Sequence, residues 1–139
     1  MNYILVDMKS INSSIFLGVL LLVLISCKKD ETSKLPPVIQ INSPTEGAMI
    51  NLLLDSVIVI DLEISDDHSM HEASLKLFNE ANEVLFGKDF PVHNKNTFKY
   101  TQSVVPPGII GKQNLRLEIK AEDQDENKSS FTRTFEVSK

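Results

Sequence analysis

Apolar and polar residues alternate along most of the chain after residue 37, with the period of two that predicts β-strands. In segment 56–65 one face carries only branched apolar side chains, namely Ile58, Ile60, Leu62 and Ile64. Segment 114–122 repeats the pattern with Leu115, Leu117, Ile119 and Ala121. Because successive side chains of a strand point to opposite faces, each segment has one face suited to a core.

Shorter segments show the same alternation: 38–42, 73–77, 84–86, 96–104 and 130–137, the last with Phe131, Phe135 and Val137 on one face. Turn-forming residues separate them, as in segments 43–47 and 79–82. Pro106-Pro107-Gly108 should end a strand, because proline cannot donate a hydrogen bond to a sheet. About seven short strands predict an all-β domain over residues 37–139, built as a two-sheet antiparallel β-sandwich.

The N-terminal part has a different pattern. Residues 15–25 are an unbroken apolar run of 11, with Lys9 and a polar stretch before it. A bilayer-spanning helix needs about 20 apolar residues, so this run predicts the core of a secretion signal instead. Translation from Met8 would give a short basic leader without Asp7, so Met1 and Met8 both remain candidate start sites.

Leu24-Ile25-Ser26-Cys27 follows this core and resembles the lipobox of bacterial lipoprotein precursors. The resemblance implies that residues 1–26 are removed and that Cys27 carries a diacylglyceryl group and an acyl chain, such as palmitate, on its amino group. Residues 27–36 would then be the lipidated cysteine and a flexible charged tether. Several acyl chains hold a protein stably on a membrane.

Residues 28–31, Lys-Lys-Asp-Glu, bear on location. Lys28 stands where inner-membrane lipoproteins often have Asp, and the Lys-then-acidic run resembles the export tag of surface-exposed lipoproteins in some Gram-negative bacteria. A solvated charged tether explains the run equally well. We therefore expect a lipid-anchored protein of the cell envelope, at the outer membrane, with cell-surface exposure left open.

The amino-acid composition argues against several kinds of partner and against a disulfide. The net charge of −5 disfavours nucleic acid and anionic lipid headgroups as partners. Cys27 is the only cysteine, so the domain must be held by its core without a disulfide. The absence of tryptophan weakens a sugar-stacking role.

The domain resembles bacterial immunoglobulin-like and cadherin-like domains of surface proteins. The resemblance rests on P-P-V-I-Q-I-N-S-P-T-E-G from residue 36, I-S-D-D from residue 64, and L-E-I-K-A-E-D-Q-D-E-N-K-S from residue 117. The last segment looks like an A-x-D-x-x-G-N turn with Glu126 where Gly is usual. The core tryptophan and cysteine pair of antibody domains are missing, and Leu115 lies near the usual position of a corner tyrosine.

Immunoglobulin-like strand order would bring two acidic loops, 66–72 and 123–127, to one end of the sandwich. Calcium prefers six to eight oxygen ligands, and the four aspartates there could contribute: Asp66, Asp67, Asp123 and Asp125. A zinc or copper site through His68 and His71, completed by His93 or Asp67, is a less favoured alternative. Turn-forming aspartates and exposed loop histidines explain the same residues without a metal.

Catalysis is not expected. Ser65 or Ser69 with His68 and Asp66 supplies the residue types of a hydrolytic triad, but neighbours on one loop rarely reach its geometry, and no nucleophile-elbow motif occurs. We therefore expect a non-catalytic interaction or adhesion module that binds an envelope or surface protein or a glycan. The alternative is a small metal-binding lipoprotein, with calcium preferred over zinc.

Overall fold

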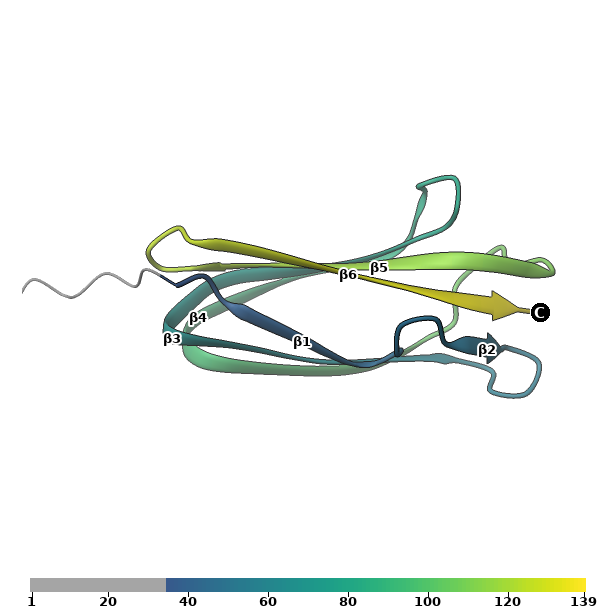
Figure 1. Ribbon diagram of the computed structural model, residues 1–139, viewed down its shortest axis with the longest axis horizontal. Helices are drawn as coiled ribbons and strands as arrows, with labels where there is room; N and C mark the ends of the chain where they lie inside the picture. Colours follow the sequence, from purple (N-terminus) through teal and green to yellow (C-terminus); the bar gives the residue numbers. More distant parts are fainter. Residues whose placement is uncertain (1–34) are drawn as a thin grey trace, which may run out of the picture. The chain divides into compact units, whose positions relative to one another are not determined.

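The computed structural model describes residues 35–139, which form an all-β domain (Figure 1). The expected signal peptide at 1–26, Cys27 and nearly all of the expected tether at 27–36 lie outside the described residues. The strands are β1 (Val38–Ser43), β2 (Met49–Asn51), β3 (Ile58–Phe78), β4 (Val84–Val104), β5 (Lys112–Asp123) and β6 (Lys128–Ser138). Within this range they make one sheet in the order β1-β3-β5-β6-β2, with β4 on β3. No helix among residues 35–139 is long and apolar enough to cross a membrane.

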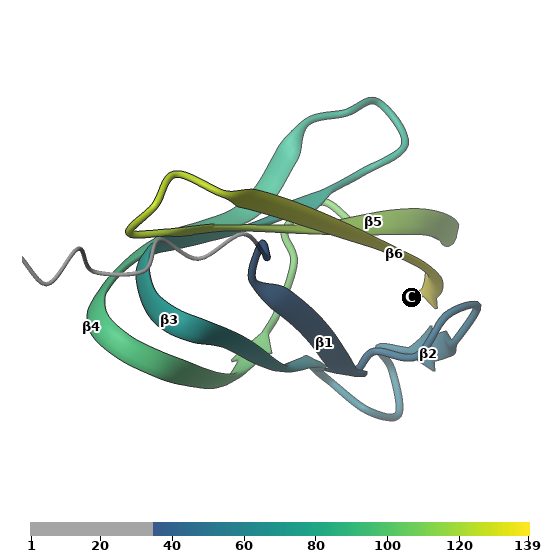
Figure 2. The ribbon, with the colours of Figure 1, turned by 60° about the vertical axis from the view of Figure 1, so that its left-hand side comes forward.

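The sheet curls because β3 and β4 form a long hairpin that bends in the middle (Figure 2). The first half of β3 pairs with β1, and its second half pairs with β5. The two halves of the curled sheet therefore face each other, with β5 and β6 opposite β1. The bend coincides with a break in the β3–β4 register between Ser65 and Met70.

The expected loop at 66–72 is therefore wrong, because these residues belong to β3. The expected segments 84–86 and 96–104 are likewise parts of the single strand β4. Bulges absorb the extra residues at the bend, so that pairing resumes on the far side instead of ending in a turn. Consequently the described part of the chain has six strands where about seven were expected.

The core lies between the facing halves of the sheet, as the alternation predicts. The side chains of Ile58, Ile60, Leu62 and Ile64 are buried from the first half of β3, and those of Leu115, Leu117, Ile119 and Ala121 from β5. Burying one such large aliphatic side chain stabilises a fold by about 1.5–3 kcal/mol. One prediction fails in part, since Phe131 is 38% exposed while Phe135 and Val137 are buried. Phe131 lies toward the start of β6, where it packs under the guanidinium of Arg133 at 5.2 Å.

Strand β4 has no neighbour on its outer side within the described sheet. Lys88 of this strand pairs in register with Leu75, and its Nζ lies 5.7 Å from the ring centre of Phe90 and 5.3 Å from that of Tyr100. Pro91 interrupts the same edge. Charged side chains at an edge and proline are both devices that hinder pairing with another chain.

Candidate functional site

The aspartates and one of the histidines singled out by the sequence lie near the start of β1. We call this group, Asp66, Asp67, His68, Asp123 and Asp125, the Asp/His end. It includes residues of the β3 bend and of the β5–β6 turn. The backbone amide of Gln124 in the turn donates a 3.0 Å hydrogen bond to the carbonyl of Ser69 in the bend. The first residue of β1, Val38, pairs with Ser65 immediately before the bend.

Asp123 organises the β5–β6 turn. Its side chain is 1% exposed. Oδ1 accepts hydrogen bonds from the backbone amides of Asp125 at 2.9 Å and Asn127 at 2.8 Å, and Oδ2 accepts one from the Asn127 side chain at 2.7 Å. Glu126 between them has φ of 65°, in the left-handed region where Gly is favoured. The buried carboxylate thus adds to the backbone hydrogen bonds of the turn, in which the amide of Asp123 donates to the carbonyl of Asn127 at 3.1 Å.

Asp66 is the least satisfied carboxylate of the Asp/His end. Its Oδ1 accepts a hydrogen bond from the amide of His68 at 2.8 Å, whereas its buried Oδ2 has no hydrogen-bond partner among residues 35–139. Burial raises the pKa of Asp66, and the nearby charges of Asp123 and Asp67 raise it further. The predicted convergence of the two acidic segments is therefore present for Asp66 and Asp123.

The histidines are divided between two places. Nδ1 of His68 lies 3.5 Å from Oδ2 of Asp125, across the two parts of the Asp/His end. The ring of His71 lies instead beside that of His93 on β4, with ring centres 4.8 Å apart. We call His71 and His93 the His pair. Among residues 35–139, no three or more His, Asp or Glu side chains are grouped closely enough to hold a metal ion.

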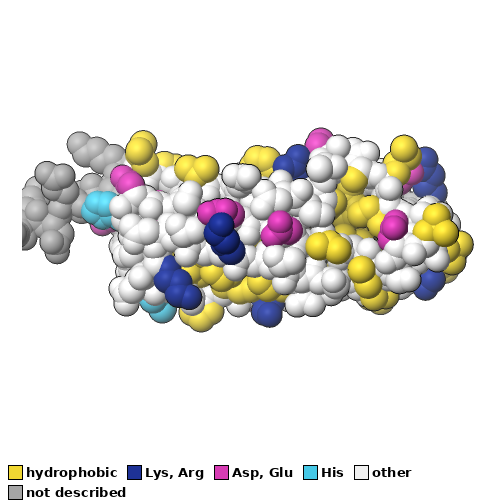
Figure 3. Space-filling model, turned by 90° about the horizontal axis from the view of Figure 1, so that it is seen from below, with side chains coloured by type: hydrophobic (Ala, Val, Ile, Leu, Met, Phe, Trp, Pro, Cys, Tyr) yellow, Lys and Arg dark blue, Asp and Glu magenta, His cyan; other side chains and the backbone are white. Residues whose placement is uncertain are grey.

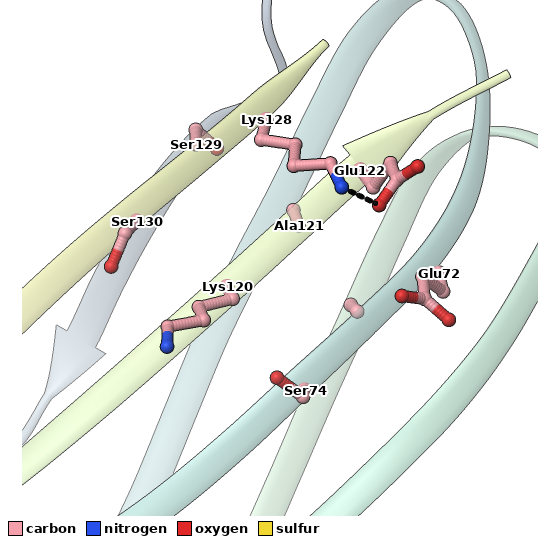
Figure 4. A pocket seen from close by; sticks show the side chains of 9 residues that line it. Glu72, Ser74, Lys120, Ala121, Glu122, Lys128, Ser129 and Ser130 are labelled. Atoms are coloured by element: carbon pink, nitrogen blue, oxygen red, sulfur yellow. Dashed lines mark ion pairs between the residues drawn. The ribbon is translucent and has the colours of Figure 1, made fainter. Parts of the chain in front are cut away.

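Sequence reasoning missed a hollow of about 420 Å³ on the sheet of β3, β5 and β6 (Figure 4). Ser74, Lys120 and Ser130 are register partners across the three strands. A second row, nearer the Asp/His end, contains Glu72, Glu122 and Lys128, and the last two form a 3.0 Å ion pair. The serines could have signalled this feature, since short side chains in a row of long ones leave a depression.

A second missed feature lies at the other end of the domain, and we call it the far-end loops. Loop 52–57 follows β2 and loop 105–111 precedes β5. Both loops border the end of β6. The amide of Leu52 donates a hydrogen bond to the carbonyl of Ser138 at 2.8 Å, and the amide of Lys139 donates one to the carbonyl of Gly111 at 3.1 Å. Apolar side chains are exposed on these loops, namely Leu53, Leu54, Val105 and Ile110, and Met49 of the preceding strand β2 is exposed as well.

Two of these apolar side chains are almost fully exposed to solvent. Leu54 is 80% exposed and Ile110 is 84% exposed. Figure 3 shows several hydrophobic side chains close together at the end of the molecule opposite to the start of β1. Single exposed apolar residues are common, whereas a group of them on adjacent loops is typical of a contact surface. The runs Leu52-Leu53-Leu54 and Ile109-Ile110, placed between strands, were the available sequence signal.

Neither the protein-family models nor the curated protein sequences contain a match to this chain. The chemistry of the described residues is therefore the basis for the function proposed below.

Proposed function

We propose that this chain is a membrane-anchored envelope lipoprotein whose domain is a non-catalytic interaction or adhesion module. The observation that carries the proposal is the group of exposed apolar side chains on the far-end loops. Burying such side chains against a partner protein would contribute about 25 cal/mol for each Å² removed from water. A protein partner fits this surface better than a glycan, because the far-end loops expose aliphatic groups.

The finer fold that we propose is an immunoglobulin-like β-sandwich. The facing halves of the curled sheet and the single core between them support it. The β5–β6 turn adds support, since Glu126 adopts positive φ at the position where the related turn has Gly. The long shared strands β3 and β4 are the main departure from a sandwich of separate strands.

Anchoring through Cys27 would give the module a direction. Leu35 is eight positions after Cys27, and an extended chain covers at most about 3.3–3.6 Å per residue, or roughly 28 Å over these eight steps. The described chain begins at the Asp/His end. That end would therefore stay near the membrane, while the far-end loops would lie on the opposite side of the domain and be free to meet a partner.

Site-specific photocrosslinking in cells tests the proposed contact surface. A photoreactive residue at Ile110 should give a discrete adduct, whereas the same residue at exposed Thr132, away from the far-end loops, should not. Replacing Leu53 and Leu54 by Ser should abolish the adduct at Ile110 without unfolding the domain, because both side chains lie outside the core. Equal labelling at both positions, or none at Ile110, would reject the surface.

Metabolic labelling with an alkyne-bearing fatty acid tests the anchor separately. We expect label on the wild-type chain and none on Cys27→Ser, with the precursor retaining its signal. The Ser14→Ala variant, which leaves the lipobox intact, should be labelled normally. Label that persists after Cys27→Ser would contradict lipidation at this residue.

The alternative function is metal binding at the Asp/His end, and one observation favours it: Oδ2 of Asp66 is buried and lacks a hydrogen-bond partner in the described part of the chain. A calcium ion would offer that oxygen a ligand bond. Calcium added to chelator-treated protein should then raise the melting temperature, because a ligand of the folded state stabilises it. Asp66→Asn should reduce the shift, and an unchanged melting temperature with calcium would exclude this function.

A further inference from the structure

The His pair is separate from the Asp/His end and is built by irregular backbone. From Met70 to Glu72, β3 advances two residues while its partner positions on β4 move from Lys95 to Pro91. Asn94 within that stretch has φ of 61°, an uncommon conformation for a residue other than Gly. Bulges of this kind re-aim side chains, and here they accompany the close approach of His71 and His93.

The spacing of the two rings suits a shared metal ion. Zinc binds imidazole nitrogen at about 2.0–2.1 Å, so two rings on one tetrahedral ion have centres about 5 Å apart. The observed separation is 4.8 Å, with the rings tilted by 55°. A tilt of this size is also found for packed rings such as Phe90 and Phe98, at 50°, so the separation of the His71 and His93 rings is the observation that supports a shared ion.

The surroundings of the His pair also fit a cation. Both rings line a hollow of about 390 Å³ together with Glu72, Asp89 and Pro91. Two carboxylates beside two imidazoles favour positive charge through space. The hollow opens to solvent, which leaves room for water or for a donor atom from a partner molecule to complete the coordination.

We propose that His71 and His93 form a two-imidazole site for Zn²⁺ or Cu²⁺ with open coordination positions. Imidazole is a preferred ligand of both ions, and copper should bind more tightly than zinc in the same site. Glu72 and Asp89 act through water and charge, because no third protein ligand is grouped with the pair among residues 35–139. This site does not depend on the anchor, on the far-end loops or on Asp66.

The chain offers a clean test because it has three histidines in all. The full chain is purified in detergent with an affinity tag free of histidine, and Zn²⁺ and Cu²⁺ are titrated by calorimetry. We expect one equivalent to bind the wild type, and either His71→Asn or His93→Asn to weaken binding about tenfold or more. His68→Asn is the matched control and should bind as the wild type does.

A second measurement guards against variants that fail to fold. Zn²⁺ titrated into the wild-type chain should shift the imidazole NMR signals of His71 and His93 and leave those of His68 in place. No binding to the wild type, equal loss in His68→Asn and His93→Asn, or shifts confined to His68 would each overturn the proposal. The last two outcomes would move the metal to the Asp/His end.

Discussion

The buried carboxylate of Asp123 should be one of the largest polar contributors to the stability of the domain. It accepts three hydrogen bonds of 2.7–2.9 Å, all within one turn. A hydrogen bond to a charged group contributes about 1.5–3 kcal/mol, but the released donors in a turn regain water. We therefore expect Asp123→Ala to lower the free energy of unfolding by about 3–4 kcal/mol, a large share of the ~5–15 kcal/mol of a typical domain.

Urea unfolding followed by circular dichroism measures this loss. With an m-value of about 1–3 kcal/mol/M, the midpoint should fall by roughly 1–4 M at unchanged slope. Asp125→Ala is the matched control in the same turn. Its side chain is more exposed and lies 3.5 Å from His68, so it should cost less than about 1 kcal/mol.

Swapping the donor and acceptor sharpens the test. In Asp123→Asn the new side-chain NH₂ group can face the side-chain NH₂ group of Asn127, so that two donors oppose each other. Part of the free energy of unfolding should therefore be lost. Adding Asn127→Asp restores an acceptor opposite the donor, and the double variant should regain about 1 kcal/mol or more. The reasoning fails if Asp123→Ala costs less than about 1 kcal/mol or if the double variant is no more stable than Asp123→Asn.

Three further predictions concern single positions. Glu126→Gly should raise the free energy of unfolding by about 1 kcal/mol in urea, because Gly adopts positive φ without steric cost; a loss of stability would contradict this. Since the pKa of Asp66 is raised, the folded state binds its proton more tightly than the unfolded chain does. The stabilisation is therefore complete below the ordinary aspartate pKa of 3.8 and is lost as pH rises through the raised pKa of Asp66. Asp66→Asn should flatten that decline in thermal melts, and an unchanged pH profile would refute the assignment. Lys88→Val should cause concentration-dependent association in sedimentation velocity, because it removes the charge from the edge strand β4. Lys76→Val lies on the interior strand β3 and should sediment as the wild type does. Identical sedimentation of the two variants would count against edge protection.

The sequence predicted the core-facing positions of the strands well, because a period of two survives wherever one strand face is buried. Ile58 to Ile64 and Leu115 to Ala121 show this directly. It could not predict that β3 continues through segment 66–71. Most of those residues are polar, and the strand is held on either side of the bend by pairs with distant residues, Ser65 with Thr97 and Met70 with Lys95 and Asp123.

In the candidate sites, too, the contacts that depend on pairing between distant strands could not be predicted from the sequence. Proximity of Asp66 to Asp123 followed from strand order, so it could be expected before the fold was known. The partner of His71 could not, because it depends on bulges in two strands at once. His93 was foreseen only as a completing ligand, whereas the structure places it as the nearest ring to His71.

The bent β3–β4 hairpin also has a consequence for how the domain folds. Its pairs begin with Phe78 and Val84 beside the turn and extend to Ile58 and Val104, so the hairpin can close stepwise from one local nucleus. Because the hairpin supplies strands to both halves of the curled sheet, its closure would bring the two halves into position at the same time. The slow step should then be formation of the parallel β2–β6 pair, which joins Met49 to Glu136, residues far apart in sequence.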